Sequence, residues 1–181
     1  MQIEECIKNR RSVRKYSDKE IDNAVLDELV DLARFSPSWA NTQVVRYHVV
    51  KNSDLKAKIA MNCTDYEYNA KTIMRCKALV VVSVVTSMSG REDDGSYSTS
   101  KKDRWEMFDA GLASQTFCLA AYGKGIGSVI LGVFDEEKIR PFISLPKNER
   151  AASLIAIGYP LSPAKSAPHR KEVSELLEII E

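Results

Sequence analysis

A dense group of cations near the N-terminus is the part of the sequence whose residue types most directly indicate chemistry. The protein has 181 residues and a formal net charge of only +1, so a local excess of positive charge requires a local explanation. Within the stretch from Asn9 to Tyr16, the polar side chains that could meet an anion are Arg10, Arg11, Ser12, Arg14 and Lys15. Guanidinium groups and hydroxyls form charge-assisted hydrogen bonds with phosphate, so one interpretation of this stretch is a phosphate site.

Two structural settings are compatible with these cations. Ile3, Cys6 and Ile7 recur at helical spacing, which predicts an N-terminal helix with Arg10 and Arg11 in its last turn. Cations in that position also complement the helix dipole without any ligand. In an extended continuation, Arg10, Ser12 and Arg14 would leave the chain on one side and converge on one anion. The residues alone leave both interpretations open.

Composition restricts the class of protein. With 44% hydrophobic and 28% charged residues of balanced sign, the chain has the composition of a single globular domain spanning residues 1–181. It lacks the basic excess that generic nucleic-acid binding requires, so we expect no nucleic-acid partner. The longest apolar run, Ala78 to Val85, is too short to cross a bilayer, and Glu4 and Glu5 stand where a signal sequence would be basic and apolar. We therefore expect a cytoplasmic protein without a membrane span.

The cysteines and histidines do not form a recognisable metal or disulfide pattern. The four cysteines are widely spaced, no C-x-x-C pair occurs, and the only histidines are His48 and His169. We expect the cysteines to be small core residues and predict no metal site. His48 alternates with apolar residues in an expected strand, so we expect it to be a hydrogen-bonded sheet residue rather than a ligand.

Apolar periodicity predicts alternating helices and strands. The expected strands are Val44 to Val50, Ala78 to Val85, Ser128 to Phe134 and Ala151 to Gly158, the second of them buried on both faces. The expected helices cover Asp22 to Phe35, Leu55 to Met61, Trp105 to Tyr122, a short turn capped by Asp135, and an amphipathic C-terminal segment with Val173, Leu176, Leu177 and Ile180 on one face. Residues 62–74 predict a partly helical cover, and residues 86–103 a long surface loop.

These elements predict an α+β fold with a mainly antiparallel sheet flanked by helices, because irregular helical segments rather than strict βαβ units separate the strands. Two motifs then make a family resemblance specific. An R-R-S-x-R motif at residues 10–14 is followed by an amphipathic helix, a P-S-x-x-N-x-Q loop at residues 37–43, and a strand. This order resembles the opening of the nitroreductase family of FMN-dependent flavoproteins. The D-A-G-L-A-S-Q run from Asp109 and the G-Y-P sequence at Gly158 also resemble that family.

The resemblance implies a set of cofactor contacts. It assigns Arg10, Arg11, Ser12 and Arg14 to the FMN phosphate and the flavin edge. It assigns the loop residues Pro37, Ser38, Trp39 and Asn41 to the flavin of a partner subunit. It assigns Asn69 to the pyrimidine edge of the flavin, and Ile130, Leu131 and Gly132 to backbone contacts near flavin N5. Shortly before the C-terminus it assigns His169 and Arg170 to the phosphate.

Two features differ from the family pattern. Trp39 stands where a small residue is frequent, and Val44 and Val45 stand where Pro-Trp is frequent, so the acceptor pocket is expected to have its own shape. A G-x-G-x-G string at Gly123, Gly125 and Gly127 is not a dinucleotide fingerprint, because it follows a helix and opens a strand.

The function implied by the resemblance is electron transfer from NADH or NADPH through FMN to a nitroaromatic, quinone or similar small acceptor, in a homodimer. The flavin supplies the chemistry, so no catalytic side chain is predicted. An alternative is a non-catalytic FMN-binding protein, such as a flavin store or redox sensor, whose pocket is closed by Trp39 and the two valines.

Overall fold

The structure is a computed structural model, and it describes residues 2–163 and 166–181. In these ranges a single sheet has four antiparallel strands in the order β1-β2-β4-β3. The strands are β1 (Val45–Val50), β2 (Ala78–Val85), β3 (Gly127–Leu131) and β4 (Glu149–Gly158). The predicted α+β class, antiparallel sheet and all four strands are therefore confirmed, with shifts of a few residues at their ends.

The described residues form six α-helices, of which all but the first lie around the sheet, and the first lies beside the fifth. They are α1 (Ile3–Asn9), α2 (Asn23–Ala33), α3 (Ser53–Asn62), α4 (Glu67–Arg75), α5 (Arg104–Gly123) and α6 (Glu136–Ile139). Short 3-10 turns occupy Trp39–Asn41, Arg140–Phe142 and Val173–Glu175. Side-chain caps fix two of the helix starts: Asn52 accepts a hydrogen bond from the amide of Leu55, and Asp135 accepts from the amides of Glu137 and Lys138.

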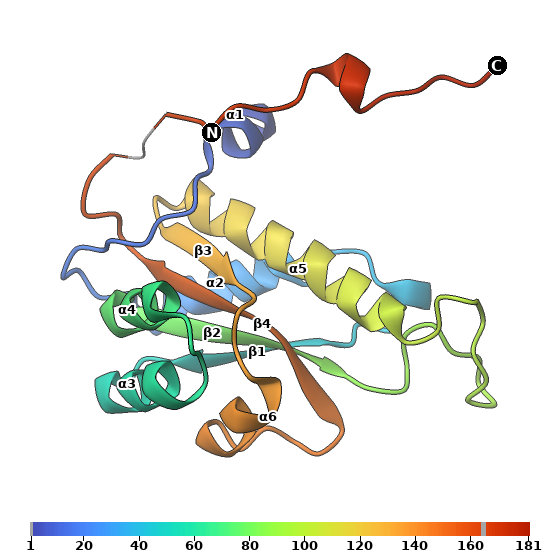
Figure 1. Cartoon of the computed structure of the whole chain (residues 1–181), viewed down its shortest axis with the longest axis horizontal. Helices are drawn as coiled ribbons and strands as arrows, with labels where there is room; N and C mark the ends of the chain where they lie inside the picture. Colours follow the sequence, from blue (N-terminus) through green and yellow to red (C-terminus); the bar gives the residue numbers. More distant parts are fainter. Residues whose placement is uncertain (1, 164–165) are drawn as a thin grey trace.

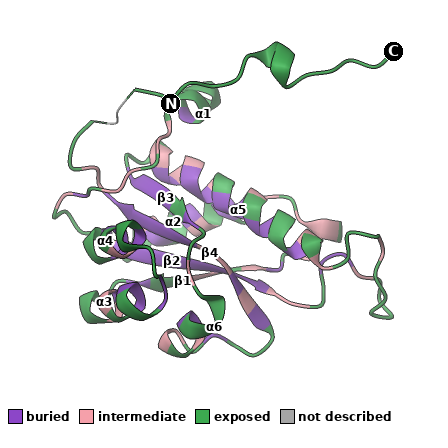
Figure 2. Ribbon diagram, viewed as in Figure 1, coloured by how far each residue is buried: buried purple, intermediate pink, exposed green. Residues whose placement is uncertain are grey.

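The sheet is covered on both faces, which gives three layers (Figure 1). Successive side chains of a strand point to opposite faces. On β2, Leu79 and Val81 pack in the cluster that holds α3, α4 and α6, whereas Val80 and Val82 pack in the cluster that holds α2 and α5. Figure 2 shows the resulting buried centre. Burial on both faces explains why β2 is an unbroken apolar run.

Several small residues of α5 lie against the sheet. Ala110 and Ala121 are buried in the core cluster with Phe117, so they allow the helix to approach the strands closely. Small residues on other sides of the helix suit packing on several sides, as at the centre of a dimer, and this stays a prediction. The outward face exposes Gly111 together with larger side chains, including Met107 and Phe108.

The end of the first helix and the C-terminal helix differ from their predictions. Helix α1 ends at Asn9, and Arg10 is its C-cap with φ −57° and ψ 132°, so Arg10 and Arg11 are outside the helix. The predicted C-terminal helix is wrong, because only the turn at Val173–Glu175 forms. Its apolar face has no core to pack against in one protomer, and residues 166–181 are exposed throughout (Figure 2).

Candidate functional site

Residues 10–16, the basic segment, pair with the edge strand β3. The amide of Val13 donates to the carbonyl oxygen of Ser128 at 3.0 Å, and Ser12 forms a parallel bridge with Ser128. The contact requires glycine at Gly127, because a Cβ there would lie 2.7 Å from Cβ of Val13. The segment is thus held by its backbone, which leaves its cationic side chains free for other contacts.

Tyr16 fixes the end of the basic segment. Its hydroxyl donates to the carbonyl oxygen of Val13 at 2.6 Å and lies 3.1 Å from that of Ala156. Burial raises the pKa of this hydroxyl, so it stays protonated as a donor. The ring packs on Gly158, where a Cβ would lie 2.7 Å from Cδ1 of the ring. Tyr16 therefore ties the basic segment to β4 as well as to β3.

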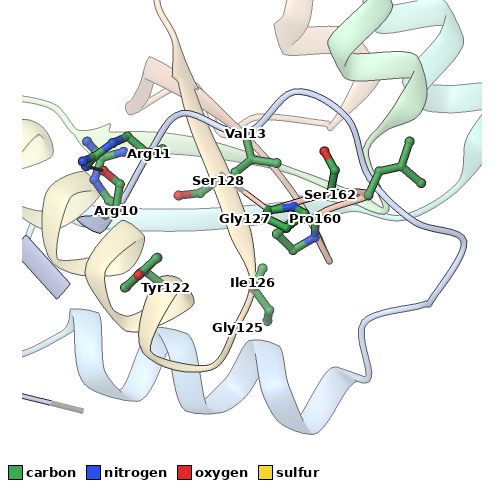
Figure 3. Close-up of a pocket in the computed structure, with 12 residues that line it drawn as sticks. Arg10, Arg11, Val13, Tyr122, Gly125, Ile126, Gly127, Ser128, Pro160 and Ser162 are labelled. Carbon is green, nitrogen blue, oxygen red and sulfur yellow. Dashed lines mark hydrogen bonds between the residues drawn. The ribbon is translucent and has the colours of Figure 1, made fainter. Parts of the chain in front are cut away.

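Arg10 and Arg11 line a cavity of about 400 Å³ beside the start of β3 (Figure 3). Its other walls are formed by Tyr122 at the end of α5, by Gly125 to Ser128, and by residues 160–163. In the described part of the chain, no carboxylate forms an ion pair with Arg10, Arg11 or Arg14. Uncompensated guanidinium groups at a cavity are the electrostatic condition for an anion site.

Orphaned polar atoms support the same conclusion. Among the described residues, Oγ of Ser128 and Nε of Arg11 are buried without an oxygen or nitrogen hydrogen-bond partner, and the side-chain partner of the Ser128 hydroxyl is the Cys118 thiol. Figure 3 places the Ser128 hydroxyl on the side of the cavity that holds the two arginines. Buried polar groups are normally paired, and unpaired ones often indicate a missing ligand. The residues present therefore fit the phosphate of FMN.

The structure does not bring all the predicted phosphate ligands to this cavity. Arg14 turns toward α4, and its guanidinium lies over the ring of Tyr68, 5.5 Å from the centroid. Ser12 pairs with β3 but does not line the cavity. The convergence of Arg10, Ser12 and Arg14 that alternation predicted is therefore not seen, because Arg10 sits at the helix C-cap and the segment bends there.

Asn69, the predicted contact of the flavin pyrimidine edge, lies next to the end of β3. It is buried on α4, and its Nδ2 donates to the carbonyl oxygen of Val133 at 3.3 Å. Beside it, Ile130 and Gly132 are exposed, and a Cβ added to Gly132 would meet nothing within 4 Å. Leu131 is buried, so only its backbone is available to a ligand. The exposed backbone of Gly132 therefore lies within one residue of the carbonyl that accepts from the Asn69 amide.

The loop of residues 38–43, the Ser38 loop, lies near the opposite end of α5. Ser38 and Gln43 line a second cavity of about 440 Å³ with Asp109, and no residue of this cavity is shared with the first. On α5, Tyr122 lines the first cavity and Asp109 the second. The rise per residue of an α-helix places these two residues roughly 20 Å apart along the helix axis. Pro37, Ser38, Trp39 and Asn41 therefore do not reach the basic segment of their own protomer.

The predicted C-terminal ligands are also separate from the cavity. His169 and Arg170 are exposed, and among the described residues the Arg170 guanidinium donates to the carbonyl oxygens of Pro168 and His169 within its own segment. Residues 160–163 line the cavity, whereas none of residues 166–181 does. Of the predicted phosphate ligands, Arg10 and Arg11 line this cavity, together with Ser128.

Sequence reasoning missed Ser128, Tyr68 and Asp109. Ser128 follows the glycine run directly, so a hydroxyl at the start of an edge strand was a usable signal. Tyr68 is exposed one residue before Asn69. Asp109 is buried and accepts hydrogen bonds from the amide of Trp39, 70 residues away in the sequence, so no local pattern could reveal it.

Other chemistry is limited in the described ranges. No group of three or more His, Cys, Asp or Glu side chains is placed to hold a metal ion. None of the helices there is long and apolar enough to cross a membrane. All four cysteines are buried, and burial raises the pKa of Cys63 and of Cys76 to about 11 in each case. Such thiols are unreactive near neutral pH, in keeping with their predicted core role.

Comparison with known proteins gives consistent matches over most of the chain. The model of the Nitroreductase family matches residues 7–65 and 62–159. A Methanothermobacter thermautotrophicus protein provisionally named NADH dehydrogenase/NAD(P)H nitroreductase is 31% identical, over 88% of this chain and 78% of its own length. The oxygen-insensitive NADPH nitroreductase of Helicobacter acinonychis is 28% identical over 83% and 84% of the two chains. The iodotyrosine deiodinase of Hydra vulgaris is 28% identical over 83% and 62%.

Solved structures agree on the fold. A nitroreductase family protein from Streptococcus pneumoniae superposes with a TM-score of 0.86 at 20% identity, over 99% of this chain and 100% of that one. An FMN-dependent nitroreductase from Clostridium difficile superposes with a TM-score of 0.77 at 21% identity, over 96% of each chain.

Proposed function

Because this chain belongs to the nitroreductase family, we propose that it is an FMN-dependent oxidoreductase that passes electrons from NADH or NADPH to a nitroaromatic, a quinone or a similar small acceptor. The observation that carries the proposal is the cavity beside β3. There, two arginines that form no ion pair within the described residues line a cavity together with Ser128, whose buried hydroxyl has no oxygen or nitrogen partner there. The names of the relatives support NADH or NADPH as the electron donor.

The chain's own residues hold and orient the cofactor. Arg10, Arg11 and the Ser128 hydroxyl bind the phosphate. Asn69 and the exposed backbone at Gly132 meet the flavin, and Arg14 closes the space beside Tyr68. When bound, the flavin accepts a hydride equivalent at N5 and passes electrons to the acceptor, so the protein needs no nucleophile or metal. Its role is to bind, orient and shelter the cofactor.

We extend the proposal to a homodimer in which each flavin site is shared. The Ser38 loop cannot reach the basic segment of its own protomer, yet the family resemblance assigns both to one flavin. The C-terminal tail also leaves apolar side chains uncovered in a single protomer, namely Val173, Leu176, Leu177, Ile179 and Ile180. A second copy related by two-fold symmetry would complete the site and cover these side chains.

Two measurements test this function. The purified protein should be yellow and should release stoichiometric FMN on denaturation, whereas a colourless protein that binds no added FMN would refute the cofactor assignment. Light scattering at micromolar concentration should give the mass of a dimer. A monomer that carries a full complement of flavin would refute the shared site.

A further inference from the structure

Three of the six residues of the Ser38 loop adopt a left-handed backbone conformation. Ala40, Asn41 and Gln43 have φ values of 42°, 57° and 50°. Side chains with a Cβ rarely occupy this left-handed region, because the Cβ approaches the following carbonyl oxygen. Clusters of such residues persist only where surrounding contacts enforce them, and they are concentrated at ligand sites. The loop therefore requires an anchor.

Asp109 supplies the anchor at the start of the loop. The amide of Trp39 donates to both carboxylate oxygens, at 3.1 Å to Oδ1 and 3.2 Å to Oδ2. The carboxylate is itself fixed. The Ser89 hydroxyl donates to its Oδ2 at 2.7 Å, and Asp109 is only 2% exposed on the helix α5. Hydrogen bonds to a buried carboxylate are among the stronger ones in proteins.

The same helix also holds the side chain of Trp39. The rings of Trp39 and Trp105 lie 4.7 Å apart between centroids, and Trp105 precedes Asp109 by one helical turn. At the other end of the loop, the amide of Gln43 donates to Oγ of Ser38. The loop is thus fixed at its entry by α5 and at its exit by its own serine.

We propose that Asp109 is a positioning residue that holds the Ser38 loop in its left-handed conformation and so sets the wall of the acceptor pocket. Ala40, Asn41 and Gln43 are exposed, so the anchored loop presents them outward. This inference rests on the proposed function, since the loop can contact an electron acceptor only if it borders a flavin. Asp109 acts through the loop backbone and does not itself touch substrate.

The test uses Asp109→Asn with Glu106→Gln as a matched control. Both substitutions convert a buried α5 carboxylate to an amide, and Glu106 likewise accepts from a backbone amide, that of Ser87, at 2.9 Å. Glu106 has no hydrogen bond or ion pair with the Ser38 loop in the described residues, and it pairs instead with Arg150. General damage to α5 would affect both variants, whereas loss of the anchor would affect only Asp109→Asn.

Hydrogen exchange of the purified holoprotein is the first readout. In Asp109→Asn, amide exchange in the peptide that covers residues 38–43 should accelerate about tenfold, while the peptide from α5 stays unchanged. In Glu106→Gln, exchange of the loop should match the wild type. Unchanged loop exchange in Asp109→Asn would overturn the anchoring.

Steady-state and rapid kinetics are the second readout. Asp109→Asn should raise KM for the acceptor severalfold and leave the rate of flavin reduction by the nicotinamide within twofold, because only the acceptor wall has loosened. Equal losses in both half-reactions, or the same losses in Glu106→Gln, would reduce Asp109 to a structural role and overturn the proposal. A wild-type protein that never reduces its flavin would refute the proposed function, whereas the exchange experiment does not depend on turnover.

Discussion

The basic segment and the Ser38 loop lie toward opposite ends of α5 and are held in opposite ways. The basic segment is fixed through its backbone by β3 and by Tyr16, and no ion pair of its cationic side chains occurs within the described residues. The Ser38 loop is fixed by a buried carboxylate and an indole contact, and its backbone carries the unfavourable conformation. The first arrangement presents charge and suits a phosphate, whereas the second presents a rigid surface and suits selection of an acceptor.

Gly127→Ala should have the largest effect, because it breaks the backbone attachment of the basic segment. The new Cβ would lie 2.7 Å from Cβ of Val13, which is branched and cannot move away cheaply. We expect a loss of about 1–3 kcal/mol in unfolding free energy together with weaker FMN binding. Denaturant unfolding and FMN titration measure the two effects. Gly123→Ala is the control, since a Cβ there meets nothing within 4 Å, and equal behaviour of the two variants would contradict the account.

Arg10→Ala tests the charge that the basic segment presents. Loss of one charge-assisted contact with phosphate should weaken FMN binding by about 1.5–3 kcal/mol, while riboflavin, which lacks the phosphate, should be much less affected. Titration of both ligands by fluorescence quenching measures the difference. Lys8→Ala, which removes a nearby exposed cation of α1, should change neither affinity. Equal losses for FMN and riboflavin would count against a phosphate site.

Trp39→Ala tests the surface that the Ser38 loop presents. If the indole narrows the acceptor pocket, kcat/KM should rise about 2–10-fold for bulky quinones or nitroaromatics, while the dimer and the FMN affinity stay nearly unchanged. Kinetics with a slim and a bulky acceptor measure this shift. A variant that loses its dimer or its flavin, with no change of acceptor preference, would assign Trp39 to packing on Trp105 instead.

Ala40→Gly should have the smallest effect, and its sign is informative. Glycine adopts a φ of 42° without steric cost, so the variant should gain about 0.5–1 kcal/mol in unfolding free energy despite the added freedom of the unfolded chain. Ala24→Gly, at an exposed position of helix α2, should instead lose about that amount. Denaturant unfolding of both variants measures the contrast, and a loss in both would show that the loop is unstrained.

Sequence patterns predicted the elements well where local periodicity decides them. The apolar runs gave all four strands and α5, because alternation and helical spacing are directly visible in the residues. The helix predicted for the amphipathic C-terminal segment around Leu176 was wrong, because an amphipathic helix needs a surface to pack against. The predicted helical conformation of Arg10 was wrong, because capping geometry and tertiary pairing decide the conformation of a residue at a helix end.

The candidate site was less accessible to sequence reasoning. Arg10 and Arg11 could be nominated because they lie in a recognisable motif, and Asn69 because the family resemblance assigns it. Asp109 could not, because its importance depends on contacts with Trp39 and Ser89 that no local pattern reveals. Ser128 was overlooked, although its place directly after the glycine run was a usable signal. The small residues of α5 could not be assigned to one partner from sequence, since close approach to a sheet and close approach to another subunit require the same composition.

Anaerobic mixing of the purified holoprotein with NADH and, separately, with NADPH tests the central claim most directly. The account predicts that the flavin absorbance bleaches rapidly with at least one of the two nicotinamides and returns when a quinone or nitroaromatic acceptor is added. A flavin that stays oxidised with both nicotinamides, in protein that carries stoichiometric FMN, would contradict the account and identify the chain as a flavin-binding protein without turnover.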